Sequence, residues 1–316
     1  MTQSHTADVL ISEVGPRDGL QNASGIMPTE AKRRWISALA ACGIPEIEVG
    51  SFVPAKVLPQ LADTADVVAH ANTIDGLDVA VLVPNLRGAQ NALAAGVDKM
   101  TVPLSVSETH SLKNVRRTHA QMFDEVRSIR AAIDALPEAK RPQLEGSLST
   151  VFGCTLEGAI PESKILAIAE TLMACGCDEV GLSDTTGYAD PAAVRHLIKV
   201  VRGVVGDEHL TGIHLHNTRG LGLANALAAF ESGLTTFDAS MGGLGGCPFA
   251  PGASGNIVTE DLVFMFEAMG VSTGIDLDAL LGVREILRAA LPDEPLYGFT
   301  PDAGLPLGFH PLKQTA

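Results

Sequence analysis

Short β-branched runs alternate with longer amphipathic segments along nearly the whole chain, and this alternation constrains the fold more than any other feature. About eight such pairs follow one another within the 316 residues. Strands that alternate with helices form a parallel sheet, and eight pairs are the number that closes a barrel. The sequence therefore predicts an α/β fold, a (β/α)8 TIM barrel. The predicted strands are residues 8–14, 46–50, 78–83, 98–104, 144–151, 178–183, 211–216 and 235–240.

Helix signals lie between the predicted strands. Asp190 supplies an N-cap followed by Pro191 in the first turn, and apolar residues then recur at helical spacing. No linker, low-complexity tract or repeat divides the chain. We therefore expect one catalytic barrel domain over residues 1–316, with the barrel at about 8–270. A C-terminal helical and irregular extension, at about 271–316, then covers the barrel or joins a subunit contact.

Composition excludes several classes of partner. The formal charge of −15 disfavours nucleic acids and anionic membranes, and an anionic substrate would need local positive charge or a metal ion at its site. The cysteines at 42, 154, 175, 177 and 247 form neither a disulfide framework nor a zinc-ribbon spacing. Neither a secretory signal nor a membrane-spanning apolar run is evident. We expect a soluble cytoplasmic protein, with Cys175 and Cys177 serving packing.

In a (β/α)8 barrel, functional residues gather at the carboxyl ends of the strands. Residues 13–22 (EVGPRDGLQN) cover the end of the first predicted strand and the loop that follows it. Arg17 and Asp18 are therefore expected at the barrel mouth. A surface ion pair in an ordinary turn is the alternative interpretation of these two residues.

Two histidines lie at the end of the seventh predicted strand. His214 and His216 are two residues apart, so both imidazoles project from one face of the strand. Two hydrogen-bonded core histidines are the alternative. Because the first, seventh and eighth strands of a closed barrel are neighbours, Asp18 and Asn256 can converge with these imidazoles. Imidazole and hard oxygen ligands suit Mg²⁺ or Mn²⁺ better than Zn²⁺.

A glycine-dense segment, residues 242–256 (GGLGGCPFAPGASGN), contains Cys247 and ends at Asn256. So much glycine indicates unusual backbone angles, close ligand approach or mobility, and a cysteine there suggests chemistry. A tight surface turn with an incidental thiol is the alternative.

Four segments taken in order resemble 3-hydroxy-3-methylglutaryl-CoA lyase. They are residues 13–22, residues 51–53 (SFV), the His214 and His216 pair, and residues 243–256. The resemblance runs from about residue 9 to residue 275. It extends to a wider group of metal-dependent lyases and Claisen-type synthases on the same barrel, which includes the isopropylmalate and homocitrate synthases.

The resemblance implies a retro-Claisen cleavage of 3-hydroxy-3-methylglutaryl-CoA into acetyl-CoA and acetoacetate. It implies a divalent metal on Asp18, His214, His216 and Asn256, with Mg²⁺ or Mn²⁺ preferred. Arg17 then stabilises the negative charge that grows on the thioester oxygen. Cys247 takes part in proton transfer.

Supporting roles are also implied by the resemblance. Glu48 orients Arg17 or a metal ligand. Helical spacing separately suggests that Glu260, one turn after Asn256, supports that ligand. The remaining matches are substrate-binding residues Gln21, Ser51 and Asp184, and CoA-binding residues Lys113 and Asn114, whose positive cluster Arg116 and Arg117 extend. The expected partner is a small acyl-CoA, and a homodimer is the expected assembly.

The sequence departs from the family pattern near the predicted pocket. Val49 and Gly50 replace two small hydroxylated residues, Gly181 replaces a serine, and Asn217 replaces an aspartate. Residues 151–158 also differ from the usual cysteine-rich pattern. Reaction class is therefore better determined than substrate, and a methylmalyl, citramalyl or longer branched 3-hydroxyglutaryl thioester stays open. A Claisen synthase, a zinc hydrolase and a noncatalytic metal-binding or acyl-CoA-binding protein are the competing hypotheses.

Overall fold

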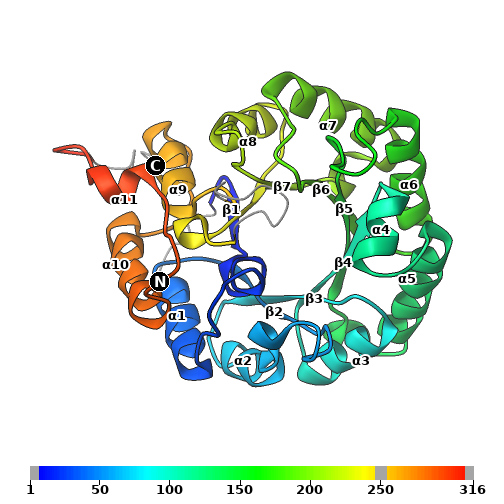
Figure 1. The fold of residues 1–316 in the computed structure, drawn as a ribbon, viewed down its shortest axis with the longest axis horizontal. Helices are drawn as coiled ribbons and strands as arrows, with labels where there is room; N and C mark the ends of the chain where they lie inside the picture. Colours follow the sequence, from blue (N-terminus) through cyan, green and yellow to red (C-terminus); the bar gives the residue numbers. More distant parts are fainter. Residues whose placement is uncertain (1–6, 246–254, 310–316) are drawn as a thin grey trace.

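The computed structural model describes residues 7–245 and 255–309. Eight parallel strands close in sequence order into a barrel, and helices surround it (Figure 1). The (β/α)8 prediction is confirmed, and each strand lies within two residues of its predicted bounds. The strands are β1 (Leu10–Glu13), β2 (Glu46–Ser51), β3 (Asp78–Leu82), β4 (Lys99–Ser105), β5 (Gln143–Ser149), β6 (Glu179–Asp184), β7 (Gly212–Leu215) and β8 (Thr236–Ala239).

Helices cover the outside of the barrel in chain order. α7 shows why they form where they do: Asp190 caps its N-terminus by accepting from the Ala192 and Ala193 amides, and Val194 and Val201 are buried, as the sequence predicts. The helices are α1 (Thr29–Ala41), α2 (Thr64–Ala71), α3 (Leu86–Ala95), α4 (Glu108–Asn114), α5 (His119–Asp134), α6 (Glu162–Ala174), α7 (Pro191–Val205), α8 (Gly222–Glu231), α9 (Thr259–Ala268), α10 (Leu277–Ala290) and α11 (Phe299–Ala303).

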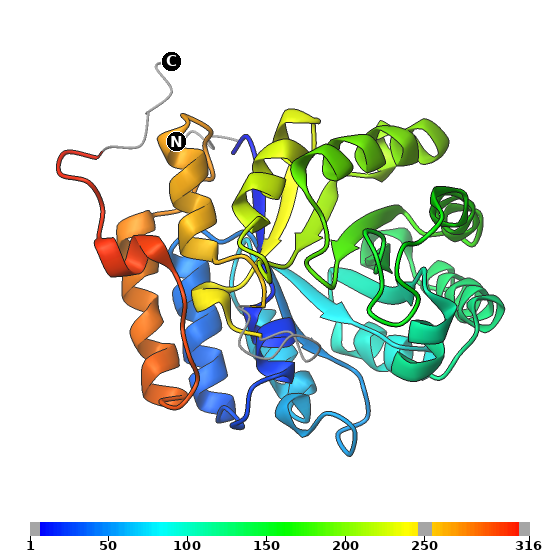
Figure 2. The same cartoon turned by 45° about the horizontal axis from the view of Figure 1, so that its top comes forward.

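The C-terminal helices pack on one side of the barrel. α10 lies alongside α1, and α11 lies against α9 (Figure 2). The segment between α10 and α11 returns to the barrel, where the Tyr297 amide donates to the Gly242 carbonyl at 2.7 Å. The described part of the extension thus packs on the segment that follows β8. Within the described residues, no helix has the length and apolar character that crossing a membrane requires.

The hydrophobic core lies between the sheet and the helices. Alternate residues of β4 show this, because Met100, Val102 and Leu104 are fully buried. The other face of the same strand carries Lys99 and Thr101, which line a cavity inside the barrel. A (β/α)8 barrel is usually filled by branched apolar side chains. Here the barrel interior is instead lined by many polar side chains, and it contains a cavity.

Candidate active site and metal centre

Arg17 and Asp18 lie in a five-residue π-helical turn, η1 (Gly15–Gly19), directly after β1. The carboxyl group of Glu13 connects this turn to the chain that follows β8. It accepts hydrogen bonds from the Met241 amide at 2.9 Å and from the Thr259 hydroxyl at 2.6 Å. Buried contacts with the segment that follows β8 therefore hold Arg17 and Asp18 at the barrel mouth.

Three of the predicted metal ligands meet at this point. The carboxylate of Asp18 and the imidazoles of His214 and His216 offer ligand atoms that all lie within 4.8 Å of one another. The two Nε2 atoms are 3.1 Å apart, and they lie 3.9 Å and 4.0 Å from Asp18 Oδ2. The structure therefore brings together residues almost two hundred positions apart in the sequence, as the closed barrel predicts.

The geometry of these three atoms fits a small divalent cation. A point equidistant from atoms with these separations lies about 2.1 Å from each, the usual length of a bond to Mg²⁺ or to a similar ion. Asn256 lies beside them, where its Nδ2 donates to Asp18 Oδ2 at 2.8 Å. Its Oδ1 is buried and has no hydrogen-bond partner in the described part of the chain. An orphaned amide oxygen next to a carboxylate and two imidazoles suits a fourth ligand.

Asp238, on β8, orients one of the imidazoles. His214 Nδ1 lies 3.0 Å from Asp238 Oδ2, which keeps the proton on Nδ1 and leaves Nε2 free to bind a metal. Burial disfavours the imidazolium, but the hydrogen bond to Asp238 and the charge of Asp18 outweigh it, and the pKa of His214 is raised. Burial and the neighbouring His214 instead lower the pKa of His216 to about 4, so this imidazole is neutral at pH 7.

The guanidinium of Arg17 is held by two carboxylates. Its Nε donates to Glu48 Oε2 at 2.5 Å and its Nη1 to Asp18 Oδ1 at 2.6 Å. Burial opposes the charge, yet Glu48 and Asp18 raise the pKa of Arg17 further, so it stays cationic. Gln21 also donates to Asp18 Oδ1, at 2.6 Å. Glu48 therefore contacts Arg17, the residue that it is expected to orient, while Gln21 contacts Asp18.

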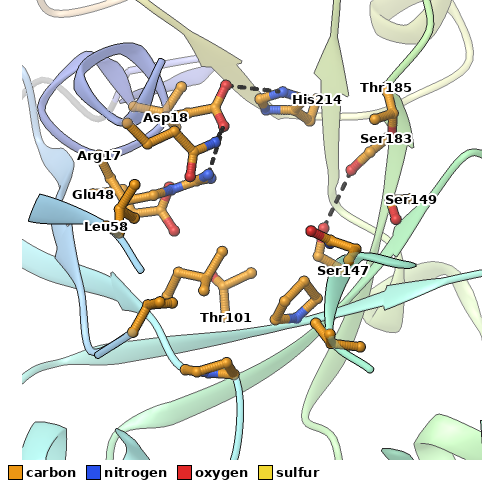
Figure 3. A pocket seen from close by; sticks show the side chains of 18 of the residues that line it. Arg17, Asp18, Glu48, Leu58, Thr101, Ser147, Ser149, Ser183, Thr185 and His214 are labelled. Carbon is orange, nitrogen blue, oxygen red and sulfur yellow. Dashed lines mark hydrogen bonds and ion pairs between the residues drawn. The ribbon is translucent and has the colours of Figure 1, made fainter. Parts of the chain in front are cut away.

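These residues open into a cavity of about 770 Å³ that runs into the barrel. Figure 3 shows Arg17, Asp18 and Glu48 on one side and hydroxyl side chains of β5 and β6 on the opposite side. Both predicted CoA-binding residues, Lys113 and Asn114, line the same cavity, and Arg116 and Arg117 line it as well. In an acidic protein, this edge supplies the local positive charge that a phosphorylated ligand requires.

The structure gives two predicted substrate-binding residues structural partners. Ser51 is buried and accepts from the Val53 amide, and the two carboxylate oxygens of Asp184 accept from the Tyr188 and Ala189 amides. Neither Ser51 nor Asp184 is among the described residues that line the cavity, so their contacts with substrate stay predictions.

Glu260 does not hydrogen-bond to Asn256 as expected. Its carboxylate accepts from the Gly242 amide at 2.9 Å and from Arg284 at 2.8 Å, because α9 aims this side chain at the segment after β8.

Cys247 lies outside the described residues, but the segments that flank it reach the metal centre. Gly245 has a φ of 105°, and a Cβ there would lie 3.1 Å from Asn256 Nδ2 and from the Asp18 carbonyl oxygen. Only glycine allows this approach. On the other side of the segment that contains Cys247, the Asn256 side chain donates to the Leu244 carbonyl at 3.3 Å.

Sequence reasoning missed the polar residues inside the barrel. Asp238 belongs to no motif, and neither do Lys99, Ser147 and Ser183. One signal could have identified them: polar residues at every second position of a predicted barrel strand must face either the apolar helix layer or the interior.

Comparison with known proteins identifies the family. The HMGL-like family model matches residues 8–287. The chain is 41% identical over 283 residues to the mitochondrial hydroxymethylglutaryl-CoA lyase of Arabidopsis thaliana, covering 90% of this chain and 59% of that protein. It is 39% identical over 297 residues to a hydroxymethylglutaryl-CoA lyase of Bacillus subtilis, covering 92% of this chain and 97% of that protein.

A solved structure agrees with this assignment. An HMG-CoA lyase from Acinetobacter baumannii, in complex with coenzyme A and 3-methylmalate, superposes with a TM-score of 0.89 at 40% sequence identity, covering 99% of this chain and all of that one. Sequence, fold and the order of the site residues thus agree, and the chain belongs to the HMGL-like family.

Proposed function

We propose that this protein is a divalent-metal-dependent lyase that cleaves 3-hydroxy-3-methylglutaryl-CoA into acetyl-CoA and acetoacetate. One observation carries the proposal: Arg17 and the ligand atoms of Asp18, His214 and His216 meet at the edge of a cavity that also reaches Lys113. Relatives about 40% identical to this chain, over most of its length, are named as lyases of this substrate.

Asp18, His214, His216 and Asn256 are the residues that would hold the metal. A bound Mg²⁺ or Mn²⁺ supplies positive charge that lowers the pKa of a hydroxyl and fixes the orientation of substrate oxygens. The chain prepares this site in advance. Asp238 fixes the tautomer of His214, and Arg17 together with the imidazoles keeps the pKa of Asp18 well below its usual range although burial opposes ionisation.

Arg17 acts on the charge that develops during cleavage. The C3 hydroxyl gives its proton to water, and its oxygen becomes the ketone oxygen of acetoacetate. The electron pair of the broken C2–C3 bond passes to the enolate of acetyl-CoA. Negative charge then grows on the thioester oxygen, and a buried guanidinium stabilises it more than water does. Because Arg17 is already held by Glu48 and Asp18, little reorganisation is needed when the charge appears.

Protonation of the enolate at C2 completes the reaction, and we assign that step to Cys247. Support comes from chain connectivity, since Cys247 is two residues from Gly245 and the next described segment begins with Gly255 and Asn256. The described neighbours Gly245 and Asn256 both lie at the metal centre, and this connectivity supports the assignment. We expect Cys247→Ala to lower kcat far more than the affinity for CoA.

A related thioester is the second candidate substrate. The Acinetobacter baumannii relative was solved with coenzyme A and 3-methylmalate, and a methylmalyl thioester would undergo the same type of cleavage.

We further propose a cytoplasmic homodimer. The thiols of the four cysteines in the described residues are all free, as a reducing compartment requires. Light scattering and cell fractionation test these two points.

The decisive assay incubates Mg²⁺-loaded or Mn²⁺-loaded protein with a panel of 3-hydroxyacyl-CoA thioesters. Released acetyl-CoA or propionyl-CoA is measured together with the companion acid. We expect 3-hydroxy-3-methylglutaryl-CoA to be cleaved and chelation to abolish the reaction. Absence of cleavage across the whole panel, or full activity after rigorous metal removal, contradicts the proposal.

A further inference from the structure

A closed ring of hydrogen bonds joins the C-terminal extension to the segment that follows β8. Arg284 on α10 donates through Nη1 to Glu260 Oε1 and to the Tyr297 carbonyl, both at 2.8 Å. Glu260 Oε2 accepts from the Gly242 amide at 2.9 Å, and the Tyr297 amide donates to the Gly242 carbonyl at 2.7 Å. We call these four residues the Arg284 clamp. Both backbone polar groups of Gly242 are therefore held by residues that Arg284 itself binds.

The clamp is buried, so water competes little for its hydrogen bonds. The side chains of Arg284 and Glu260 are only 2% and 0% exposed. Burial raises the pKa of Glu260, while the Gly242 amide and the charge of Arg284 act against that rise. Arg284 therefore favours the charged form of Glu260, and a charged carboxylate binds an amide more strongly than a neutral carboxyl group does.

The left-handed backbone of Gly242 leaves room for the clamp. Its φ is 64°, and an added Cβ would lie 3.0 Å from Leu296 Cδ2 and 3.3 Å from Arg284 Nη1. A side chain at this position would strain the backbone and crowd the guanidinium. Leu296 and Tyr297 lie beyond residue 287, where the match to the HMGL-like family model ends. The clamp thus connects a segment outside the family match to a glycine inside it.

Gly242 lies two residues before a backbone carbonyl that contacts the metal centre. The Leu244 carbonyl accepts from Asn256 Nδ2 at 3.3 Å, and the same Nδ2 donates to Asp18 Oδ2 at 2.8 Å. These two bonds orient the amide, and its buried Oδ1 remains as the fourth proposed ligand. A displacement of Gly242 would therefore reach the metal centre through the Leu244 carbonyl.

Resting on the proposed metal-dependent function, we propose that Arg284 is a positioning residue, whose clamp on Gly242 directs Asn256 to the metal ion. Asp18 is held separately by Arg17, so loss of the clamp should weaken metal binding without abolishing it. Loss of an outer partner typically costs 10- to 100-fold in metal affinity. Because Arg284 acts through further residues, we expect the lower end of this range, about 10-fold.

Mn²⁺ titration of the full-length protein, followed by electron paramagnetic resonance, measures the effect without any thioester. Arg284→Met should raise the Kd by about 10-fold, and Arg284→Lys, which keeps the charge, should restore part of the affinity. Arg288→Met is the matched control, because Arg288 lies on the same helix in an exposed ion pair with Glu285. Its Kd should stay within about twofold of wild type.

Thermal melting confirms that each variant is folded. Arg284→Met/Glu260→Gln leaves no unpaired buried charge and takes the place of Arg284→Met if that variant does not fold. It should also weaken Mn²⁺ binding, because the Tyr297 carbonyl loses its partner. A Kd equal to that of Arg288→Met overturns the proposal, whether or not the protein cleaves any thioester.

A double-mutant cycle separates positioning of Asn256 from a general loss of stability. Asn256→Ala removes the amide through which the clamp acts. Adding Arg284→Met to it should change the Kd by less than about twofold, whereas independent effects would multiply. Multiplying effects refute the proposal.

Hydrogen exchange of the metal-free protein provides a second measurement. The peptide that contains the Gly242 amide should exchange at least about 10-fold faster in Arg284→Met than in Arg288→Met, because the amide loses a firmly held acceptor. A peptide from α5, on the opposite side of the barrel, should exchange at the same rate in both variants (Figure 1). Unchanged exchange at Gly242 also refutes the proposal.

Discussion

Removing Asp238 should weaken metal binding although Asp238 is not itself a predicted ligand. Its Oδ2 lies 3.0 Å from His214 Nδ1, and this contact holds the Nδ1 proton and directs Nε2 at Asp18 and His216. Loss of such an outer partner typically costs 10- to 100-fold in metal affinity, or about 1.4 to 2.7 kcal/mol. We therefore expect Asp238→Ala to raise the Kd for Mn²⁺ by about 10- to 100-fold.

Mn²⁺ titration followed by electron paramagnetic resonance measures this change directly. Asp238→Asn keeps an oxygen acceptor for Nδ1 without the charge, so its Kd should lie between wild type and Asp238→Ala. Asp278→Ala removes the same charge from an exposed site on α10 and controls for net charge. Saturating Mn²⁺ should restore most of the lyase activity of Asp238→Ala. If Asp238→Ala binds Mn²⁺ as tightly as wild type, the assignment of Asp238 as the partner that orients His214 is wrong.

Three further predictions concern the ligands, buried charge and packing. His216→Ala removes one of the three converging ligand atoms and should abolish Mn²⁺ binding in the same titration; retained tight binding would place the metal elsewhere. Burial raises the pKa of Glu13 to about 8 from an ordinary 4.5, so its contribution to the free energy of unfolding is complete below pH 4.5 and is lost as pH rises through 8. Urea unfolding should show that Glu13→Gln removes this loss, up to about 1.4 kcal/mol per pH unit, whereas an identical pH slope in both proteins would contradict it. Gly181→Ser should cost about 1 to 3 kcal/mol by displacing Glu145, while Gly203→Ser, with no atom within 4 Å of the added Cβ, should cost less than half as much.

Much of the fold could be predicted from the sequence because its signals are local. Apolar spacing in α7 and the Asp190 cap depend on contacts within one or two helical turns, and the structure has both. The convergence of Asp18 with His214 could also be predicted, because closure of an eight-stranded barrel makes the first and last strands neighbours.

Roles that depend on side-chain direction were harder to predict. Glu260 lies one helical turn after Asn256 in the sequence, yet its carboxylate turns to Gly242 and Arg284. Asp184 accepts from two backbone amides of the loop that follows β6. In both cases the sequence places the residue near the site, but the path of the neighbouring chain decides which donor it meets.

The sequence by itself determined the strand order, the reaction class and the identity of the metal-ligand candidates, because these follow from periodicity and from motifs that are continuous along the chain. Only the tertiary structure decided which side chains share the barrel interior. Lys99, Glu145, Ser147 and Asp238 come from three different strands, and no local pattern joins them. Strand register and the direction of each Cβ set their distances, so the shape and polarity of the cavity are properties of the closed barrel.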